Sequence, residues 1–221
     1  MTLERESSRL EDPEAQLLDS ISSRWARYGR MLMISLGVIV VVAAGVFFTL
    51  RARAADEEQA AGKLAEANLY FWQGAYDRSL PVARQVAEQW PNSPSGIDAH
   101  RVAGDDQFWL GKFKESAAEY QLYLAKKKSG LIPDAVRRSL AYALESDLQF
   151  KEAASVYEGL AGKFDRESSG EFLYAAARCY RQLNQSKEAD QMLKRLLDEY
   201  GETSNANRAR MLRAQLAAAP R

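Results

Sequence analysis

Cysteine and histidine are nearly absent from this 221-residue sequence, which holds one of each, Cys179 and His100. A single cysteine excludes an intramolecular disulfide. A zinc site or a thiol–imidazole catalytic pair would have to use both residues or take further groups from elsewhere in the chain, and no suitable spacing occurs. We therefore expect no metal site, and we expect Cys179 to be a small buried apolar residue and His100 a surface or packing residue.

Excess charge and catalytic motifs are also missing. Thirty lysine and arginine residues balance thirty aspartate and glutamate residues, whereas a nucleic-acid-binding protein normally carries a basic excess. The sequence holds no phosphate-binding loop, no nucleophile elbow and no defensible pair of catalytic carboxylates. We expect no enzymatic activity, no cofactor, no nucleic-acid partner and no small-molecule substrate.

The sequence does contain one long apolar run, residues 31–50, which is twenty residues without a charge. A helix of that length spans roughly 30 Å, the thickness of the hydrocarbon core of a bilayer. The run predicts a single transmembrane helix that contacts lipid and anchors the chain. The alternatives are a buried helix of a soluble domain and a signal peptide cleaved after residues 52–54, although secretory apolar cores are usually shorter.

Residues 1–30 form a short charged tail. Asp12 and Pro13 are typical of a helix start, and Trp25 and Tyr28 follow among arginines. We expect either an amphipathic helix at the membrane interface or a disordered tail. Three basic residues lie within fifteen residues on each side of the apolar run, so the positive-inside rule does not set the topology.

A pattern with a period of about 37 residues fills the sequence after the apolar run. Residues 71–76 and 108–113 carry the same motif of aromatic residues around a glycine, 37 residues apart. Small residues recur with nearly the same spacing at two positions of each repeat: Ala67, Gly104, Ala141 and Ala177, and Ser79, Ser116, Ala153 and Ala189. A fixed period in this range indicates stacked helical hairpins. Aromatic residues before each second helix would fill the wedge between hairpins: Tyr76, Phe113 and Phe150.

The pattern resembles the tetratricopeptide repeat (TPR) family over about residues 59–201. The first unit has the family's marked residues: Ala67, Tyr70, Gly74, Tyr76 and Pro91. Leu148 and Asn184 stand where glycine is usual, and the fourth unit departs most from the family pattern.

We predict an all-α chain with a single N-terminal transmembrane helix, a TPR-like α-solenoid of about four helical hairpins, and a C-terminal capping helix. The expected segments are a charged tail (1–30), the transmembrane helix (31–50), a linker helix (51–58), the repeats (59–202), and a capping helix and tail (203–221).

The resemblance implies a concave protein-binding groove lined mainly by the first helix of each hairpin. The family's groove positions correspond here to Asn68, Phe71, Trp72, Arg101, Asp105, Phe108, Trp109, Arg138, Tyr142, Glu145, Tyr174, Arg178 and Arg181. Aromatic and arginine side chains dominate binding energy at interfaces, so we expect an extended or helical protein segment there, acidic near the last arginines. The alternative is that the tryptophans plug the hairpin turns and the arginines form weak surface ion pairs.

The whole layout, with an anchor introduced by Tyr28, Gly29 and Arg30, is similar to the ancillary, periplasm-facing subunit of the bacterial Sec translocon. This resemblance implies a single-pass inner-membrane protein with a cytoplasmic N-terminus and a periplasmic repeat domain that contacts exported polypeptides, a chaperone-like role. A second hypothesis is a scaffold or assembly subunit of another membrane protein complex.

Overall fold

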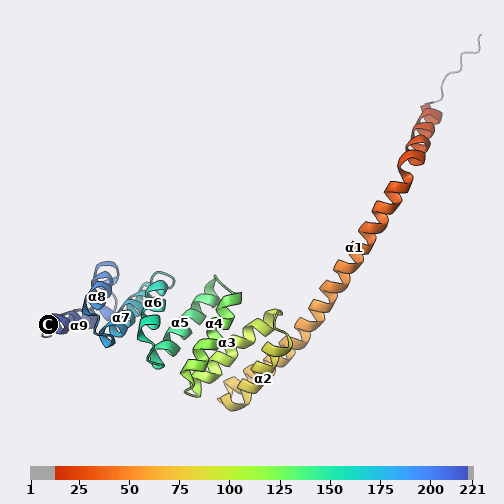
Figure 1. Ribbon diagram of the computed structural model, residues 1–221. Helices are drawn as coiled ribbons and strands as arrows, with labels where there is room; N and C mark the ends of the chain where they lie inside the picture. The colour runs from red at the N-terminus through yellow and green to blue at the C-terminus, as the bar shows by residue number, and fades with distance from the viewer. Residues whose placement is uncertain (1–12, 219–221) are drawn as a thin grey trace, which may run out of the picture. The chain divides into compact units, whose positions relative to one another are not determined.

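The computed structural model describes residues 13–218, and these form nine α-helices: α1 (Pro13–Trp72), α2 (Tyr76–Gln89), α3 (Pro94–Trp109), α4 (Phe113–Lys126), α5 (Leu131–Ser146), α6 (Phe150–Leu160), α7 (Arg166–Gln182), α8 (Ser186–Tyr200) and α9 (Asn205–Ala218) (Figure 1). The chain divides into two compact units, Met1–Ala54 and Ala55–Arg221, so α1 contributes to both. A long apolar N-terminal helix followed by stacked helical hairpins confirms the predicted all-α class.

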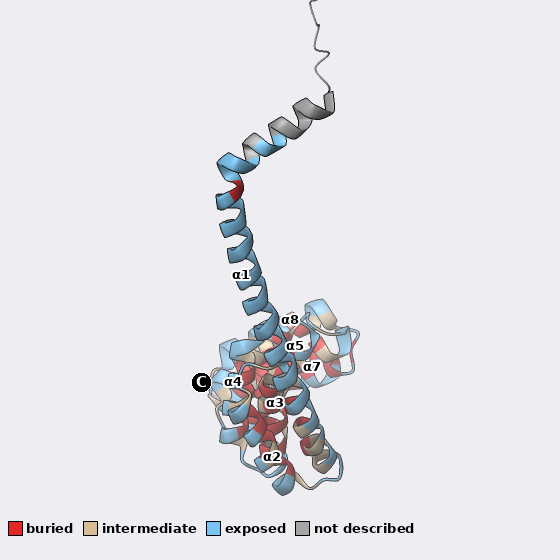
Figure 2. Cartoon of the chain, turned by 90° about the vertical axis from the view of Figure 1, so that its right-hand side faces the viewer, coloured by how far each residue is buried: buried red, intermediate tan, exposed pale blue. Residues whose placement is uncertain are grey.

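The first unit consists, in its described part, of the N-terminal portion of α1. The described part of the helix starts at Pro13, and Asp12, the other residue of the predicted helix start, lies outside the described residues. Every residue from 31 to 50 is exposed, and Figure 2 shows this exposure along the helix. The stretch Trp25–Trp72 is the part of the described chain that is long and apolar enough to cross a membrane. A core helix of a soluble domain would be mostly buried, so this exposure contradicts that alternative. A signal sequence would be equally apolar and exposed, so that alternative stays open.

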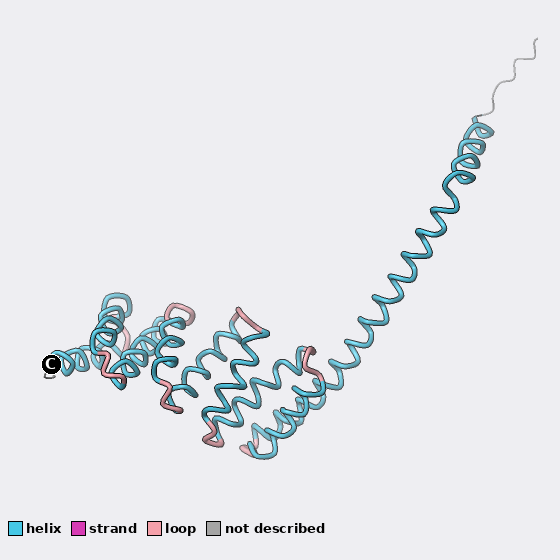
Figure 3. Tube along the Cα trace, in the orientation of Figure 1, coloured by secondary structure: helices cyan, strands magenta, loops and turns pink. Residues whose placement is uncertain are grey.

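The second unit is a stack of antiparallel hairpins. The last part of α1 pairs with α2, and α3/α4, α5/α6 and α7/α8 form the next three pairs, each helix packing on its neighbours in the sequence. The loops between hairpins lie along one edge of the stack, and the tight turns within hairpins lie along the opposite edge (Figure 3). The last helix, α9, packs on α7 and α8 and buries Ala206, Ala209 and Leu212, as expected of a capping helix.

The turn inside each hairpin has the same backbone conformation in all four repeats. Gly74 and Gly111 both have φ of 74°, and Leu148 and Asn184 have φ of 61° and 57°. These values lie in the left-handed region, which glycine adopts freely and leucine rarely. The fold therefore retains the glycine conformation at the two positions where the sequence departs from glycine.

The small residues of the repeat lie where two helices of a hairpin meet. All eight positions that carry them are buried. In the first two hairpins the second-helix serine also donates a hydrogen bond to the first helix, Ser79 to the carbonyl of Ala67 at 2.9 Å and Ser116 to that of Gly104 at 2.8 Å. A Cβ atom at Gly104 would lie 2.6 Å from the ring of Tyr120, so glycine is needed for this close approach.

The aromatic residues Tyr76, Phe113 and Phe150 are the first residues of α2, α4 and α6 and are half-buried. Two of them contact the first helix of their own hairpin. Tyr76 meets Phe71 edge-on with 5.4 Å between ring centroids, and Phe113 meets Phe108 in the same way at 5.4 Å. These two equivalent contacts close the turn end of the first two hairpins.

Candidate functional site

The predicted groove residues all lie on the first helices of the hairpins, and they fall into four groups: Asn68, Phe71 and Trp72 on α1; Arg101, Asp105, Phe108 and Trp109 on α3; Arg138, Tyr142 and Glu145 on α5; and Tyr174, Arg178 and Arg181 on α7. None of them is fully buried, so each presents part of its surface to solvent. Because these residues all lie on first helices and are at least partly exposed, they are accessible to a partner.

A pocket of about 170 Å³ brings together four of them. Asp105, Phe108 and Trp109 of α3 face Tyr142 of α5 across this pocket, and Tyr120 and Ser139 complete its lining. The lining thus comes from two neighbouring hairpins. Its aromatic walls and single carboxylate suit a side chain with an apolar body.

A second, smaller cavity of about 50 Å³ lies between α5, α6, α7 and α9. Tyr142 lines this cavity too, together with Tyr174 and Arg178 of the predicted set. Arg208 of α9 and Glu171 of α7 were not predicted and also line it. Because Tyr142 lines both cavities, they are neighbours along a line from α3 through α5 to α7.

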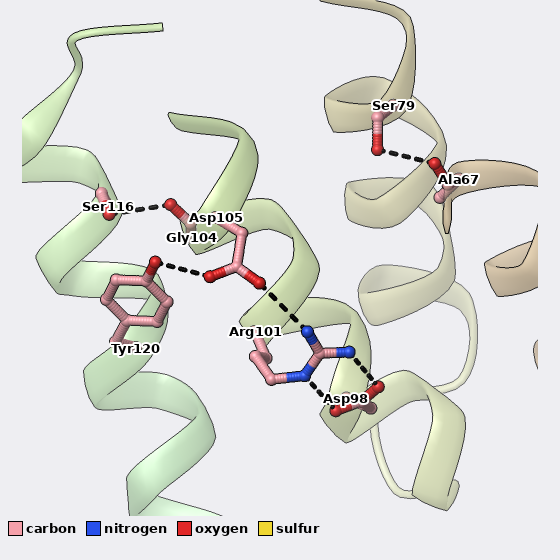
Figure 4. A network of polar contacts seen from close by, with 8 residues as sticks. All are labelled: Ala67, Ser79, Asp98, Arg101, Gly104, Asp105, Ser116 and Tyr120. Atoms are coloured by element: carbon pink, nitrogen blue, oxygen red, sulfur yellow. Dashed lines mark hydrogen bonds and ion pairs between the residues drawn. The ribbon is translucent and has the colours of Figure 1, made fainter. Parts of the chain in front are cut away.

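Asp105 is the centre of a hydrogen-bond network at the first pocket (Figure 4). The Tyr120 hydroxyl donates to its carboxylate at 2.7 Å, and Arg101 donates to it at 3.0 Å. The same guanidinium makes two bonds of 2.8 Å to Asp98. Burial raises the pKa of Asp105, while the bonds from Tyr120 and Arg101 oppose that shift.

Glu145 repeats this arrangement one hairpin further along. The hydroxyl of Tyr157, which is 37 residues after Tyr120, donates to Glu145 at 2.7 Å. Arg178 of α7 donates to the other carboxylate oxygen at 2.7 Å. Two of the groove arginines, Arg101 and Arg178, are therefore already paired with carboxylates. An anion bound here would compete with these pairs.

The ring of Tyr174 lies between two arginines at the second cavity. The guanidinium of Arg208 is 4.3 Å from the ring centroid, and that of Arg178 is 6.0 Å away. The Nε atom of Arg178 is buried and makes no hydrogen bond within the described chain. This end of the line combines an aromatic face with two cations, one of which has an unused donor.

The two tryptophans are exposed side chains at the turn end of their helices. Trp109 is 62% exposed and stacks on Tyr76 with 5.8 Å between ring centroids. Trp72 is 81% exposed, and its one ring contact among the described residues is with Phe71, edge-on at 5.5 Å. Trp109 lines the first pocket. Neither indole is enclosed by the turn beside it.

The remaining predicted residues lie outside both cavities. Asn68 and Phe71 are half-buried near Trp72, and Arg181 is exposed near the end of α7. Arg138 lies over the ring of Phe164 at 5.8 Å. The structure thus brings six of the thirteen predicted residues to the two cavities and leaves the others along the same helices.

The single histidine lies beside a carboxylate of the next helix, and the single cysteine is packed in the core. His100 of α3 lies 2.7 Å from Glu119 of α4, and Arg84 of α2 approaches the same carboxylate at 3.7 Å. Cys179 is fully buried, and burial raises the pKa of its thiol to about 12. Within residues 13–218, no three histidine, cysteine or acidic side chains converge as metal ligands.

Seven residues that line the two cavities were not among the predicted groove positions: Tyr120, Ser139, Tyr157, Glu171, Phe172, Ala175 and Arg208. The sequence signal that could have identified Tyr120 is its recurrence 37 residues later as Tyr157. The hydroxyl groups of both tyrosines donate a hydrogen bond to a carboxylate of a first helix. Arg208 belongs to the capping helix, which lies outside the repeat pattern, so periodicity could not find it.

Comparison with known proteins agrees with this architecture. The profile of the tetratricopeptide repeat family matches residues 171–203, the fourth hairpin. This is the unit that we expected to depart most from the family, but its core positions Ala177, Ala189 and Leu193 are all fully buried. No curated protein matches the sequence.

Solved structures share the fold at low sequence identity. A tetratricopeptide repeat protein from Parabacteroides merdae has a TM-score of 0.60 and 16% identity, over 72% of this chain and 60% of that one. A protein with nearly identical TPR-like repeats from Podosopora anserina has a TM-score of 0.54 and 17% identity, over 73% of this chain and 91% of that one. The apo form of RapI has a TM-score of 0.56 and 11% identity, over 72% of this chain and 63% of that one. The fourth hairpin thus matches the tetratricopeptide repeat family, and the second unit has a TPR-like fold.

Proposed function

We propose that this chain is a membrane-anchored protein-interaction module. Residues 31–50 of α1 would span the bilayer, and the two cavities across α3, α5 and α7 would bind a segment of a partner protein. TPR proteins bind protein partners, and the exposure of all twenty residues of the apolar run supports the anchor.

The observation that carries the binding proposal is the exposed Trp109 beside the pocket that it shares with Tyr142. The indole is 62% exposed, and aromatic side chains of this kind supply much of the binding energy at protein interfaces. An aromatic or aliphatic side chain of the partner would enter this pocket. An acidic group of the same segment would then lie toward Tyr174, Arg178 and Arg208.

The finer proposal concerns the place of binding. The similarity of the layout to the ancillary subunit of the Sec translocon supports a cytoplasmic N-terminus, an extracytoplasmic second unit and exported chains as partners. A scaffold of another membrane complex is the second candidate. In that case stable subunits, rather than exported chains, would occupy the groove.

Site-specific photocrosslinking in living cells tests the proposal. A photoreactive amino acid at Trp109 or Tyr142 should crosslink to protein, whereas the same group at Leu122, an exposed leucine on α4, should not. Mass spectrometry of the adducts separates translocon components and exported chains from subunits of another assembly. Equal crosslinking from Leu122 and Trp109 would contradict a specific groove.

The double variant Phe108→Ala, Trp109→Ala gives a second, independent check. It should lose those crosslinking partners at Tyr142 while keeping its helix content, with Leu122→Ala as the matched control. If the folded double variant retains every partner, the groove does not bind them.

A further inference from the structure

The loop between α4 and α5 presents cationic and apolar side chains together. Lys126, Lys127 and Lys128 are all exposed at the end of α4. Leu131 and Ile132 follow at the start of α5 and are 76% and 59% exposed. Among the ion pairs of the described residues, none uses these three lysines. Five exposed residues of these two kinds within seven positions are unusual for a surface that faces only water.

A cavity of about 460 Å³ opens directly behind this loop. Its polar lining comes from three segments and includes Lys128, Ser129, Arg137, Ser155 and Lys163. Asp134 is the one acidic residue of the lining, and it pairs with Arg137 at 2.7 Å. Arg137 also donates to the backbone carbonyl of Lys128, which fixes its guanidinium in the cavity wall. The cavity is therefore cationic, with hydroxyl groups available as further donors.

We propose that this surface, the α4–α5 basic patch (Lys126, Lys127, Lys128, Leu131, Ile132, Arg137 and Lys163), docks on an anionic phospholipid bilayer. The lysines complement the negative charge of the bilayer surface. The exposed aliphatic side chains enter the boundary between headgroups and acyl chains, and the cavity receives a phosphate group of a lipid.

An acidic protein surface is a poorer match for the patch. Protein hot spots are rich in tryptophan, tyrosine and arginine, whereas the exposed tip of this loop has lysine, leucine and isoleucine. Flexible lysines beside bulky aliphatic residues are typical of segments that lie at a membrane interface.

The proposal rests on the membrane anchor proposed above, because the anchor keeps the second unit beside a bilayer. Only residues 51–54 separate the apolar run from Ala55, the first residue of the second unit. At that end of the unit, Glu57 accepts hydrogen bonds from the backbone and hydroxyl of Ser95, at 3.0 and 2.7 Å. Ser95 follows the loop between α2 and α3, and the α4–α5 loop lies on the same edge of the stack (Figure 3). A short tether makes docking an intramolecular step, so a weak patch suffices.

Fluorescence of the full chain in lipid nanodiscs tests the proposal. An environment-sensitive fluorophore is attached at Ser129→Cys in the loop, or at Gln73→Cys on the opposite edge as a control. The buried thiol of Cys179 stays unlabelled. The label at residue 129 should shift to shorter wavelength and be quenched by lipid-borne quenchers in nanodiscs that contain phosphatidylglycerol. It should not respond with phosphatidylcholine alone or at high salt.

Charge variants supply the matched comparison. Replacing Lys126, Lys127 and Lys128 by glutamine should lower the docking equilibrium on the order of a hundredfold, which is about fivefold for each lysine. Replacing Lys112, Lys114 and Lys151, exposed lysines on the opposite edge, by glutamine should change nothing. Circular dichroism of both triple variants checks that the helices are intact.

The outcomes separate the possible occupants. The proposal is overturned if the label at residue 129 responds equally in neutral and anionic nanodiscs. It is also overturned if both triple variants lose docking to the same extent. A response to inorganic phosphate that matches the response to anionic lipid indicates a free-anion site and overturns it as well. Resistance of the protein to carbonate extraction reports the anchor separately: an extractable protein would overturn both proposals, and an inserted protein without lipid-dependent fluorescence would overturn only this one.

Discussion

The ring of Tyr76 stacks on the indole of Trp109 across the boundary between the first and second hairpins, with 5.8 Å between centroids and 9° between planes. Tyr76 begins α2 and Trp109 ends α3, so one contact links the turn ends of two repeats. The same indole lines the pocket that we propose as the binding site. Packing between repeats and the proposed binding of a partner therefore involve the same side chain.

A double-mutant cycle can separate these two roles of Trp109. Replacing Tyr76 and Trp109 by leucine, singly and together, should give a coupling free energy of about 0.5–1.5 kcal/mol, the usual worth of an aromatic pair beyond its buried area. The measurement is urea unfolding followed by circular dichroism. The control is the cycle of Tyr76 with Trp72, which has no ring contact with Tyr76 in the described structure and should couple weakly. Equal coupling in the two cycles would contradict the stacking contact.

The close approach of α3 and α4 predicts the effect of a single methyl group. Gly104→Ala should lower the free energy of unfolding by about 1–3 kcal/mol, because its Cβ would lie 2.6 Å from a Tyr120 ring that Asp105 holds in place. Gly62→Ala is the control: this helical glycine of α1 has no atom within 4 Å of a new Cβ. The free energy of unfolding of this variant should rise by about 0.5–1 kcal/mol. Thermal unfolding of both variants would decide the matter, and a neutral Gly104→Ala would contradict the required contact.

The stacked hairpins could be predicted from the sequence because packing demands the same residue size at equivalent positions. Small residues 37 residues apart marked the helix crossings, and the structure buries all of them. The conformation of Leu148 and Asn184 was less visible, since the side chain at these positions does not reveal the glycine-like backbone. At these two positions the place in the repeat, and not the residue type, determines the backbone conformation.

The pairing of the groove arginines could not be predicted from sequence. Arg178 bonds to Glu145 from 33 residues away, a distance that is not the repeat period and depends on how α7 is rotated against α5. The neighbouring residues Asp105 and Asp106 also look alike in the sequence. Successive residues of a helix point about 100° apart, so Asp105 reaches the groove while Asp106 is fully buried.

The left-handed turn at Leu148 predicts a stabilising substitution. Leu148→Gly should raise the free energy of unfolding by up to about 1 kcal/mol, since a side chain with a Cβ atom costs about 1–2 kcal/mol in this conformation and glycine's flexibility when unfolded cancels part of the gain. Asn184→Gly should gain less, because asparagine tolerates the same region. Differential scanning calorimetry compares the two variants with the parent chain. A destabilised Leu148→Gly would show that the exposed leucine makes a contact worth more than the strain.

The buried carboxyl group of Asp106 predicts a pH dependence of stability. This side chain is fully buried and neither oxygen has a hydrogen-bond donor within the described chain. Burial raises its pKa from 3.8 to about 7. The nearby Ser79 hydroxyl opposes this shift in part, although its hydrogen bond goes to the carbonyl of Ala67, and the charge of Asp105 adds to the shift. Because the folded-state pKa is the higher one, the stabilisation from the bound proton is complete below pH 4 and is lost as the pH rises through about 7.

Asp106→Asn removes this titration while keeping a neutral side chain of the same size. Between pH 5 and pH 8 the free energy of unfolding of the parent chain should fall by on the order of 3 kcal/mol relative to that of the variant. The variant should therefore be the more stable protein at pH 8. Urea unfolding at the two pH values measures the difference. Asp56→Asn, at an exposed position of α1, serves as the control and should run parallel to the parent chain. If the curves of Asp106→Asn and the parent also run parallel, the carboxylate is ionised in the fold throughout this range and must have acquired a donor that the static structure does not contain.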